Sequence, residues 1–318
     1  MDSVPYVFCR DVCRSLGLEN SAYRELSGAL TGRWKAASDQ HAQNLTTITV
    51  QFGKDDVGWF YKMETSDGRL IKSPAELSRC SKRYTAIARV EVVLLPFWTN
   101  EPTRCLKDEI VVELAPLLRE RLAPRFCLMV HHCPEDVALA AYQMFPSPFT
   151  VDALHIIFHC KESEDLVVAH LDNNPRIRRL VLSGFPHTTT LEDRILKLLR
   201  SASFQCFSLE YNFTIPFTLE MFKAFLDAWL QAEQSITQYL TAIGGGSRGV
   251  EPREILSIPV PPDVTRTVKD SPHLNKLSVL WTKANRWYLS VNCLSNGQRH
   301  TEGILPLTRF FIWSAQRS

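Results

Sequence analysis

The stretch that decides the fold is Ile177-Arg178-Arg179-Leu180-Val181-Leu182, in which apolar residues follow the order apolar, two residues, apolar, one residue, apolar. The same frame occurs at four further places, which begin at Ile87, Ala123, Val151 and Phe204. Helix-like segments lie between the frames. Such a repeat indicates a strand-plus-helix unit that buries its apolar face against the next copy of itself. It predicts an α/β stack of parallel strands joined by crossovers, with the helices on one face of the sheet.

The residues before the first frame divide into a helical segment, residues 1–43, and a segment of 44–85 that changes period. Apolar residues on one side predict a helix that ends near Gly17 and a second helix, capped by Asn20 or Ser21, that runs past Trp34. Alternating apolar residues then predict a β-hairpin with its turn at Gly53–Gly58. Ser73-Pro74-Ala75-Glu76 carries a cap, a proline and a glutamate in the positions that start a short helix.

The repeat-like α/β domain is predicted to span residues 86–243, and the glycines at 244–246 to form a loop or linker after it. The remainder, 244–318, is predicted to be a β-rich C-terminal cap. Its expected strands are Arg253–Val260, Leu274–Trp281, Trp287–Cys293 and Ile304–Trp313.

The composition is typical of a folded intracellular protein. The chain has 318 residues, 45% of them hydrophobic, and a formal net charge of +2, which gives no global reason to expect nucleic acid or membrane as a partner. The start has no signal-peptide pattern, and no apolar stretch approaches the roughly 20 residues that span a bilayer. Nine scattered cysteines without a Cys-x-x-Cys pair indicate reduced thiols, and therefore the cytoplasm or the nucleus.

Two patterns suggest chemistry, and each also has a simpler interpretation. Gly245-Gly246-Ser247-Arg248-Gly249 matches a serine-hydrolase elbow, but a helix is expected before it and Pro252 follows, so a flexible loop is favoured. His131-His132-Cys133 and His155-x-x-x-His159-Cys160 could place His131 and His159 on adjacent strands. A zinc site usually needs three or four ligands, so polar packing between strands is favoured. We therefore expect no catalytic residue, no metal and no cofactor.

The frame also assigns the two faces of the sheet. Residues between the apolar positions alternate outward, and this outward ladder mixes arginine, methionine, histidine and β-branched residues, which suits a protein interface. The predicted substrate-binding residues are Arg125, Met129, His155, Ile157, Arg179 and Val181. The alternative is that the C-terminal segment folds over this face.

The N-terminal sequence resembles a known family. Met1 to Cys9, the stretch from Leu26 to Trp34-Lys35 and the Trp59-Phe60-Tyr61-Lys62 segment resemble nematode F-box proteins that carry a repeat-like associated domain. Val4-Pro5 and Arg33-Trp34 stand roughly where an F-box has its Leu-Pro and basic-aromatic pairs. The resemblance implies a leucine-rich-repeat-like domain, and Phe204-x-x-Phe207-x-Leu209-x-x-Asn212 reaches the asparagine position of such repeats.

The resemblance further implies a substrate receptor of a cullin-RING ubiquitin ligase, in which the F-box binds a Skp-type linker protein and the repeats bind a protein substrate. The residues predicted to dock the linker lie on the first helix: Pro5, Phe8, Val12 and Leu16. We expect part of this helix face to be exposed. The chain is thus predicted to be a non-enzymatic protein-binding adaptor. A scaffold without linker binding is the alternative, and a hydrolase using Ser247 is a weaker one.

Overall fold

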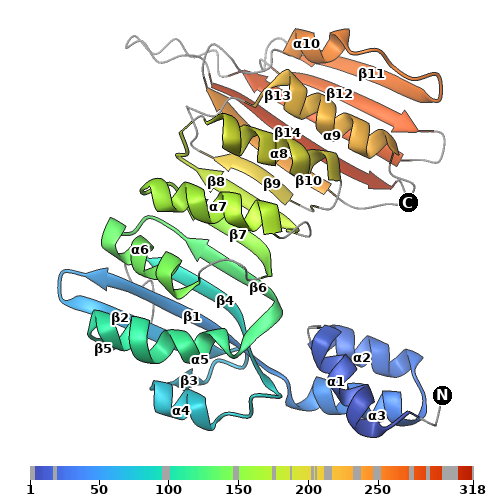
Figure 1. Cartoon of the computed structure of the whole chain (residues 1–318). Helices are drawn as coiled ribbons and strands as arrows, with labels where there is room; N and C mark the ends of the chain where they lie inside the picture. The colour runs from blue at the N-terminus through green and yellow to red at the C-terminus, as the bar shows by residue number, and fades with distance from the viewer. Residues whose placement is uncertain are drawn as a thin grey trace. The chain divides into compact units, whose positions relative to one another are not determined.

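The computed structural model of the chain consists of two compact units, Met1–Ala153 and Leu154–Ser318, each a mixture of helices and strands (Figure 1). The division falls inside the segment 86–243, which the sequence predicts to be one domain. The structure describes residues 4–16, 20–94, 101–145, 150–173, 177–186, 188–201, 204, 206–210, 217–231, 238–245, 252–271, 276–283, 287–295 and 307–316.

The first unit begins with a bundle of three helices, α1 (Tyr6–Leu16), α2 (Asn20–Ala29) and α3 (Gly32–Asn44). Small and aromatic side chains form its core: Cys9, Cys13, Tyr23, Ala37 and Ala42. The prediction of one helix running past Trp34 is wrong, because α2 ends before Gly32. The φ angle of Gly32 is +58°, a left-handed conformation that glycine adopts without the clash of a Cβ atom.

The sheet of the first unit has the strand order β6-β4-β1-β2-β3, and β5 pairs with β2. Strands β1, β4 and β6 are parallel, whereas β1 and β2 form the predicted antiparallel hairpin. The strands are β1 (Thr46–Asp55), β2 (Gly58–Thr65), β3 (Leu70–Ile71), β4 (Thr85–Val93), β5 (Thr103–Cys105) and β6 (Leu122–Val130).

The hairpin turn is shorter than predicted. Gly53 lies within β1, and only the residues between Asp55 and Gly58 turn, with the backbone N–H groups of Val57 and Gly58 donating to the Asp55 carboxylate at 3.0 and 3.2 Å. Gly53 is needed for close packing instead. A Cβ atom on Gly53 would stand 2.0 Å from the carbonyl oxygen of Val93 in β4, so β1 and β4 approach each other here only because this residue has no side chain.

Helices cover the inner face of this sheet. The predicted short helix is present as α4 (Pro74–Arg79), with the Glu76 N–H donating to the Ser73 hydroxyl at 3.2 Å. A π-helical turn, η1 (Glu109–Leu114), leads into α5 (Ala115–Arg119), and α6 (Glu135–Met144) follows β6. The ring of Phe126 on β6 lies 5.8 Å from that of Phe145, directly after α6, so this core holds β6 to its helix.

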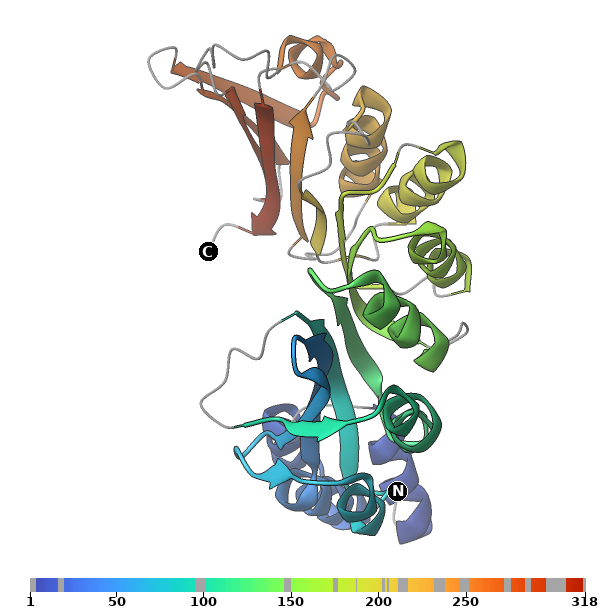
Figure 2. The same ribbon diagram turned by 90° about the vertical axis from the view of Figure 1, so that its left-hand side faces the viewer.

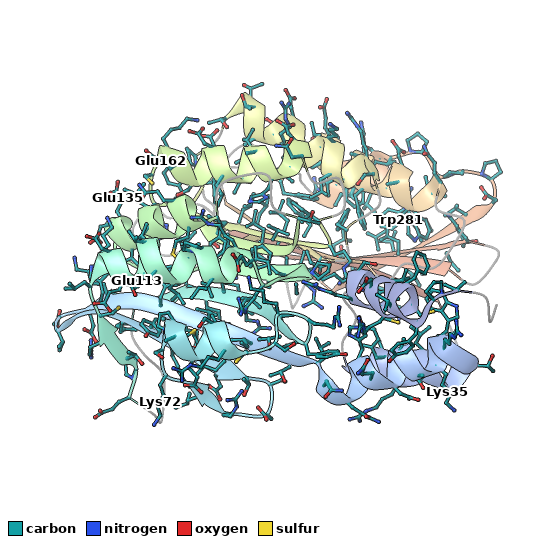
Figure 3. The ribbon with its side chains drawn as sticks, turned by 60° about the horizontal axis from the view of Figure 1, so that its bottom comes forward. Lys35, Lys72, Glu113, Glu135, Glu162 and Trp281 are labelled. Carbon is teal, nitrogen blue, oxygen red and sulfur yellow. The ribbon has the colours of Figure 1, made fainter. Side chains whose placement is uncertain are left out.

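The second unit alternates strands and helices as the frame predicts, from β7 (Val151–Ile157), whose first residues belong to the first unit, to β10 (Gln238–Gly245). Its helices lie on one side of the sheet (Figure 2). The ring of Trp281, which is labelled in Figure 3, lies 5.9 Å from that of Phe222. The elements between β7 and β10 are α7 (Lys161–Asn173), β8 (Arg179–Ser183), α8 (Thr189–Ser201), β9 (Cys206–Glu210) and α9 (Leu219–Gln231).

The C-terminal segment continues the sheet, with strand order β11-β12-β13-β14-β10-β9-β8-β7. Two predictions are wrong here. Gly244 and Gly245 lie in β10, because they pair with Thr308 and Leu307 of β14. Residues 253–260 contain a helix, α10 (Pro252–Ser257), because Pro252 fits a first helical turn. The remaining strands are β11 (Val264–Ser271), β12 (Lys276–Lys283), β13 (Trp287–Ser295) and β14 (Leu307–Gln316).

In the repeated frame, two residues separate the first apolar position from the second, and in β4 this spacing has a structural cause. In β4 the register shifts after Ile87, so Ala88 is an extra residue, and Ile87 and Val90 both point inward with no exposed surface. The frames of β8 and β9 pair in step, Leu180 with Phe207. From Arg89 onward, β4 pairs with β6 two residues away from the alignment of their frames, Val90 with Leu128. A shift of two residues keeps the inward and outward faces of both strands.

Candidate protein-binding surfaces

Helix α1 carries apolar residues on two sides, and the bundle buries only one of them. Cys9 and Cys13 are 0% and 1% exposed, whereas Phe8 is 55% and Leu16 is 41% exposed. Val12 is partly exposed. Phe8, Val12 and Leu16 follow one another at four-residue intervals and therefore line one strip of the helix. With the exposed Pro5 before the helix, they form what we call the α1 stripe: Pro5, Phe8, Val12 and Leu16. The expected exposure is present.

The stripe extends onto α3. The rings of Phe8 and Trp34 meet edge to face at 6.2 Å, and Trp34 is partly buried where it packs against the core of the bundle. Lys35 beside it is exposed on the bundle (Figure 3). Val7, 54% exposed, lies outside the predicted stripe. An apolar strip with a basic rim is the composition expected of a site for another protein.

Hydrogen bonds between the three helices hold the bundle together. The Tyr23 hydroxyl donates to the Cys13 carbonyl at 2.5 Å, and the Ser38 hydroxyl donates to the Tyr23 carbonyl at 2.8 Å. The Tyr6 hydroxyl reaches Gln40 Oε1 at 2.8 Å. The side chains of the stripe take no part in these bonds.

His41 joins the bundle to the start of β4. Its ring is 1% exposed, lies 5.3 Å from the Tyr23 ring and 5.4 Å from the Tyr84 ring, and its Nε2 is 3.0 Å from the Arg10 carbonyl oxygen. Burial lowers the pKa of His41, and the positive charges of Arg83 and Arg10 act in the same direction. A neutral imidazole with its proton on Nε2 fits this position.

The predicted substrate residues alternate outward as expected. Leu180 and Leu182 point inward with no exposed surface, whereas Arg179 is exposed and Val181 partly exposed. The six residues nevertheless lie on different units. Arg125 and Met129 are on β6 of the first, and the others, which we call the β7–β8 group, are on the second: His155, Ile157, Arg179 and Val181. One contiguous patch of all six therefore stays a prediction.

The outward charges of the first unit largely neutralise one another. Glu91 accepts from Gln51 Nε2 at 2.5 Å and from Arg89 at 3.2 Å, and Lys62 is paired with Glu64 at 2.5 Å. The side chains of Arg125 on β6 and Arg179 on β8 are exceptions, because neither has an ion pair or hydrogen bond among the described residues. The β7–β8 group combines its unpaired cation with two apolar side chains, a composition that suits a binding surface.

The alternative that the C-terminal segment covers the outward face is wrong for the described strands. Strands β11 to β14 pair edge to edge, and β14 joins β10, so they widen the sheet of the second unit instead of lying over it.

The structure bears differently on the hydrolase and metal hypotheses. Ser247 lies outside the described residues, but the strand β10 precedes it and α10 begins at Pro252. The two expectations that disfavoured a hydrolase elbow, a helix before the serine and none after it, are therefore both wrong. No group of three or more metal-ligand side chains occurs among the described residues. Burial raises the pKa of the Cys133 thiol to about 12, which keeps it protonated at neutral pH.

Comparison of the chain with protein-family models, curated proteins and solved structures gives no match. Within the described residues, no helix has both the length and the apolar character to cross a membrane.

Proposed function

We propose that this chain is a non-enzymatic protein-binding adaptor whose N-terminal bundle acts as an F-box-like module. In this proposal the α1 stripe docks a Skp-type linker of a cullin-RING ubiquitin ligase, and the outward sheet face holds a protein substrate. The observation that carries it is the stripe itself: Phe8 and Leu16 remain about half exposed while Cys9 and Cys13 on the same helix close the core.

The energy of such docking comes from the apolar surface that the bundle leaves in water. Full burial of one phenylalanine or leucine side chain stabilises by about 1.5–3 kcal/mol. Because Phe8 and Leu16 already have roughly half of their surface buried, each has about half of that energy left to contribute to a partner. The Trp34 edge next to Phe8 adds to the same patch.

The test is binding of the full chain to a purified Skp-type linker, measured by calorimetry. We expect Phe8→Ala to weaken binding by about 1–2 kcal/mol, which is roughly 5- to 30-fold. Val57→Ala is the matched control, because Val57 is 78% exposed at the hairpin tip, outside the bundle. Circular dichroism should show both variants folded. Absence of linker binding by the unaltered chain would refute the F-box-like role.

Substrate recognition is assigned to the β7–β8 group. A leucine-rich-repeat-like stack is part of this proposal, and the in-step pairing of Leu180 with Phe207 supports it. Arg179→Ala and Ile157→Ala are each expected to weaken substrate binding by about 1–2 kcal/mol without altering the fold. An adaptor of this kind would act in the cytoplasm or the nucleus.

The alternative is a protein-interaction scaffold that binds through the sheet face and has no linker. The exposed, unpaired Arg179 favours it independently of the bundle. Capture of a partner that depends on Arg179 but not on Phe8 would support the scaffold over the adaptor. The weaker hydrolase hypothesis has its own check, because a fluorophosphonate probe should leave Ser247 unlabelled, and labelling there would favour the enzyme.

A further inference from the structure

Strand β11 forms one end of the strand order in the second unit. It pairs with β12 along one side, with Val268 opposite Val279 and Asp270 opposite Leu277. A strand in this position presents backbone N–H and C=O groups along its other side, where a further strand can add.

The side chains of β11 leave this edge open. Val268 is 43% exposed, and Thr267, Lys269 and Asp270 are also exposed. Among the described residues, cover is found at the start of the strand, where Val264 is buried and Arg266 donates from Nη1 to the Ile258 carbonyl at 2.8 Å. Residues 267–270 are thus exposed, Val268 is the apolar residue among them, and the partly buried Arg266 beside them has further N–H groups to donate.

The sequence of β11 is self-complementary in one antiparallel register. With Val268 opposite Val268 of a second copy, Arg266 faces Asp270 of that copy, and the symmetry repeats the pair. Arg266, Val268 and Asp270 alternate along the strand, so the three pairs share one face of the extended sheet. The Asp270 carboxylate has no ion pair or hydrogen bond in the described part of its own chain, which leaves it available for this contact.

We propose that two copies of this chain associate through antiparallel β11–β11 pairing about Val268. Charged residues on an edge strand usually prevent such pairing. Here the same charges become complementary, because the register places Arg266 against Asp270 and Lys269 against Thr267. A two-strand contact buries little surface, so the dimer is weak and forms only at high protein concentration.

Disulfide trapping tests the register. Residues directly opposite each other in an antiparallel pair have Cα atoms about 4.5–5.5 Å apart, within disulfide range. V268C is therefore expected to give a covalent dimer under mild oxidation. T265C is the control, because this equally exposed position would lie about 20 Å from its symmetry mate. The unaltered chain shows how much covalent dimer its native cysteines form by themselves.

Sedimentation velocity of the full chain at up to about 200 µM tests the association itself. We expect a reversible dimer that Asp270→Lys weakens at least about tenfold and that the exchanged pair Asp270→Arg with Arg266→Asp restores. A monomer at every concentration overturns the proposal. So does a dimer that V268C fails to trap above T265C, or one that Phe8→Asp abolishes. None of these outcomes bears on linker binding.

Discussion

Replacement of Leu180 by alanine, compared with the same replacement at Val181, tests the assignment of the two sheet faces. Both residues lie in β8, but Leu180 is 0% exposed and faces the helices, whereas Val181 is partly exposed on the other face. The change Leu180→Ala removes three carbon atoms, and at about 0.8 kcal/mol for each the loss of transfer free energy alone is about 2.4 kcal/mol.

The close packing around Leu180 adds a cavity term. Its strand neighbour in register is Phe207, also 0% exposed, and the rings of Phe207 and Phe204 lie 6.4 Å apart. Aromatic rings held on several sides collapse poorly into a void, so we expect a total of about 3–4 kcal/mol, within the range measured for buried leucines. Val181→Ala removes two carbon atoms from a partly hydrated surface and should change the free energy of unfolding by about 0.5 kcal/mol or less.

Urea unfolding followed by circular dichroism measures both values. With an m-value of about 2 kcal/mol/M, Leu180→Ala shifts the midpoint by about 1.5–2 M, and Val181→Ala by about 0.25 M at most. Equal shifts in the two variants would mean that β8 is buried on both faces. The β7–β8 group would then not be a surface, and the substrate proposal would lose its basis.

Three further predictions concern the first unit. Tyr23→Phe removes the hydrogen bond to the Cys13 carbonyl and should lower the free energy of unfolding by about 1 kcal/mol in urea titrations, whereas an unchanged value would mean that water replaces the bond. The pKa of His41 in the folded chain lies below its ordinary value, so the unfolded chain binds a proton first as the pH falls. The free energy of unfolding should therefore decrease below about pH 6.5, and a His41→Gln variant should lose this dependence in urea titrations at different pH. Arg104 donates to Asp55 at 2.6 Å and holds the pKa of that carboxyl below its usual value. Arg104→Ala should therefore raise the pKa of Asp55 in an NMR titration, and an unchanged value would mean that the ion pair does not cause the shift.

The sequence predicts the elements whose local signals agree with their surroundings. The hairpin appears because alternation over Ile48, Val50 and Phe52 is reinforced by a parallel neighbour, β4, on the other side of β1. The start of α4 appears because Ser73 and Glu76 form a cap within four residues, without help from the rest of the fold. In the second unit the frame predicts both the alternation and the burial of Leu180.

The failures arise where tertiary pairing overrides local preference. The glycines Gly244 and Gly245 predict a linker, yet both extend β10 because they pair with Thr308 and Leu307 of β14. The sequence does not predict β11, because its mostly polar and charged residues show no clear alternation of apolar side chains. Such a composition is typical of an edge strand, which pairs with a neighbour on one side only. Helical spacing predicts the residues of the α1 stripe, but it cannot show that Cys9 is buried in the bundle while Phe8 is exposed on another side of α1.

The side of α1 that the bundle buries explains why the other side can bind. A bundle of about 40 residues has little core of its own. Here that core uses small residues, Cys9 and Cys13, which let α1 approach α3 closely, and it is tied to β4 by the ring contact between His41 and Tyr84. The larger side chain of Phe8 contributes to this core only through the edge of Trp34. Its exposed surface adds little to folding and favours self-association in water, so its presence is best accounted for by a partner that covers it.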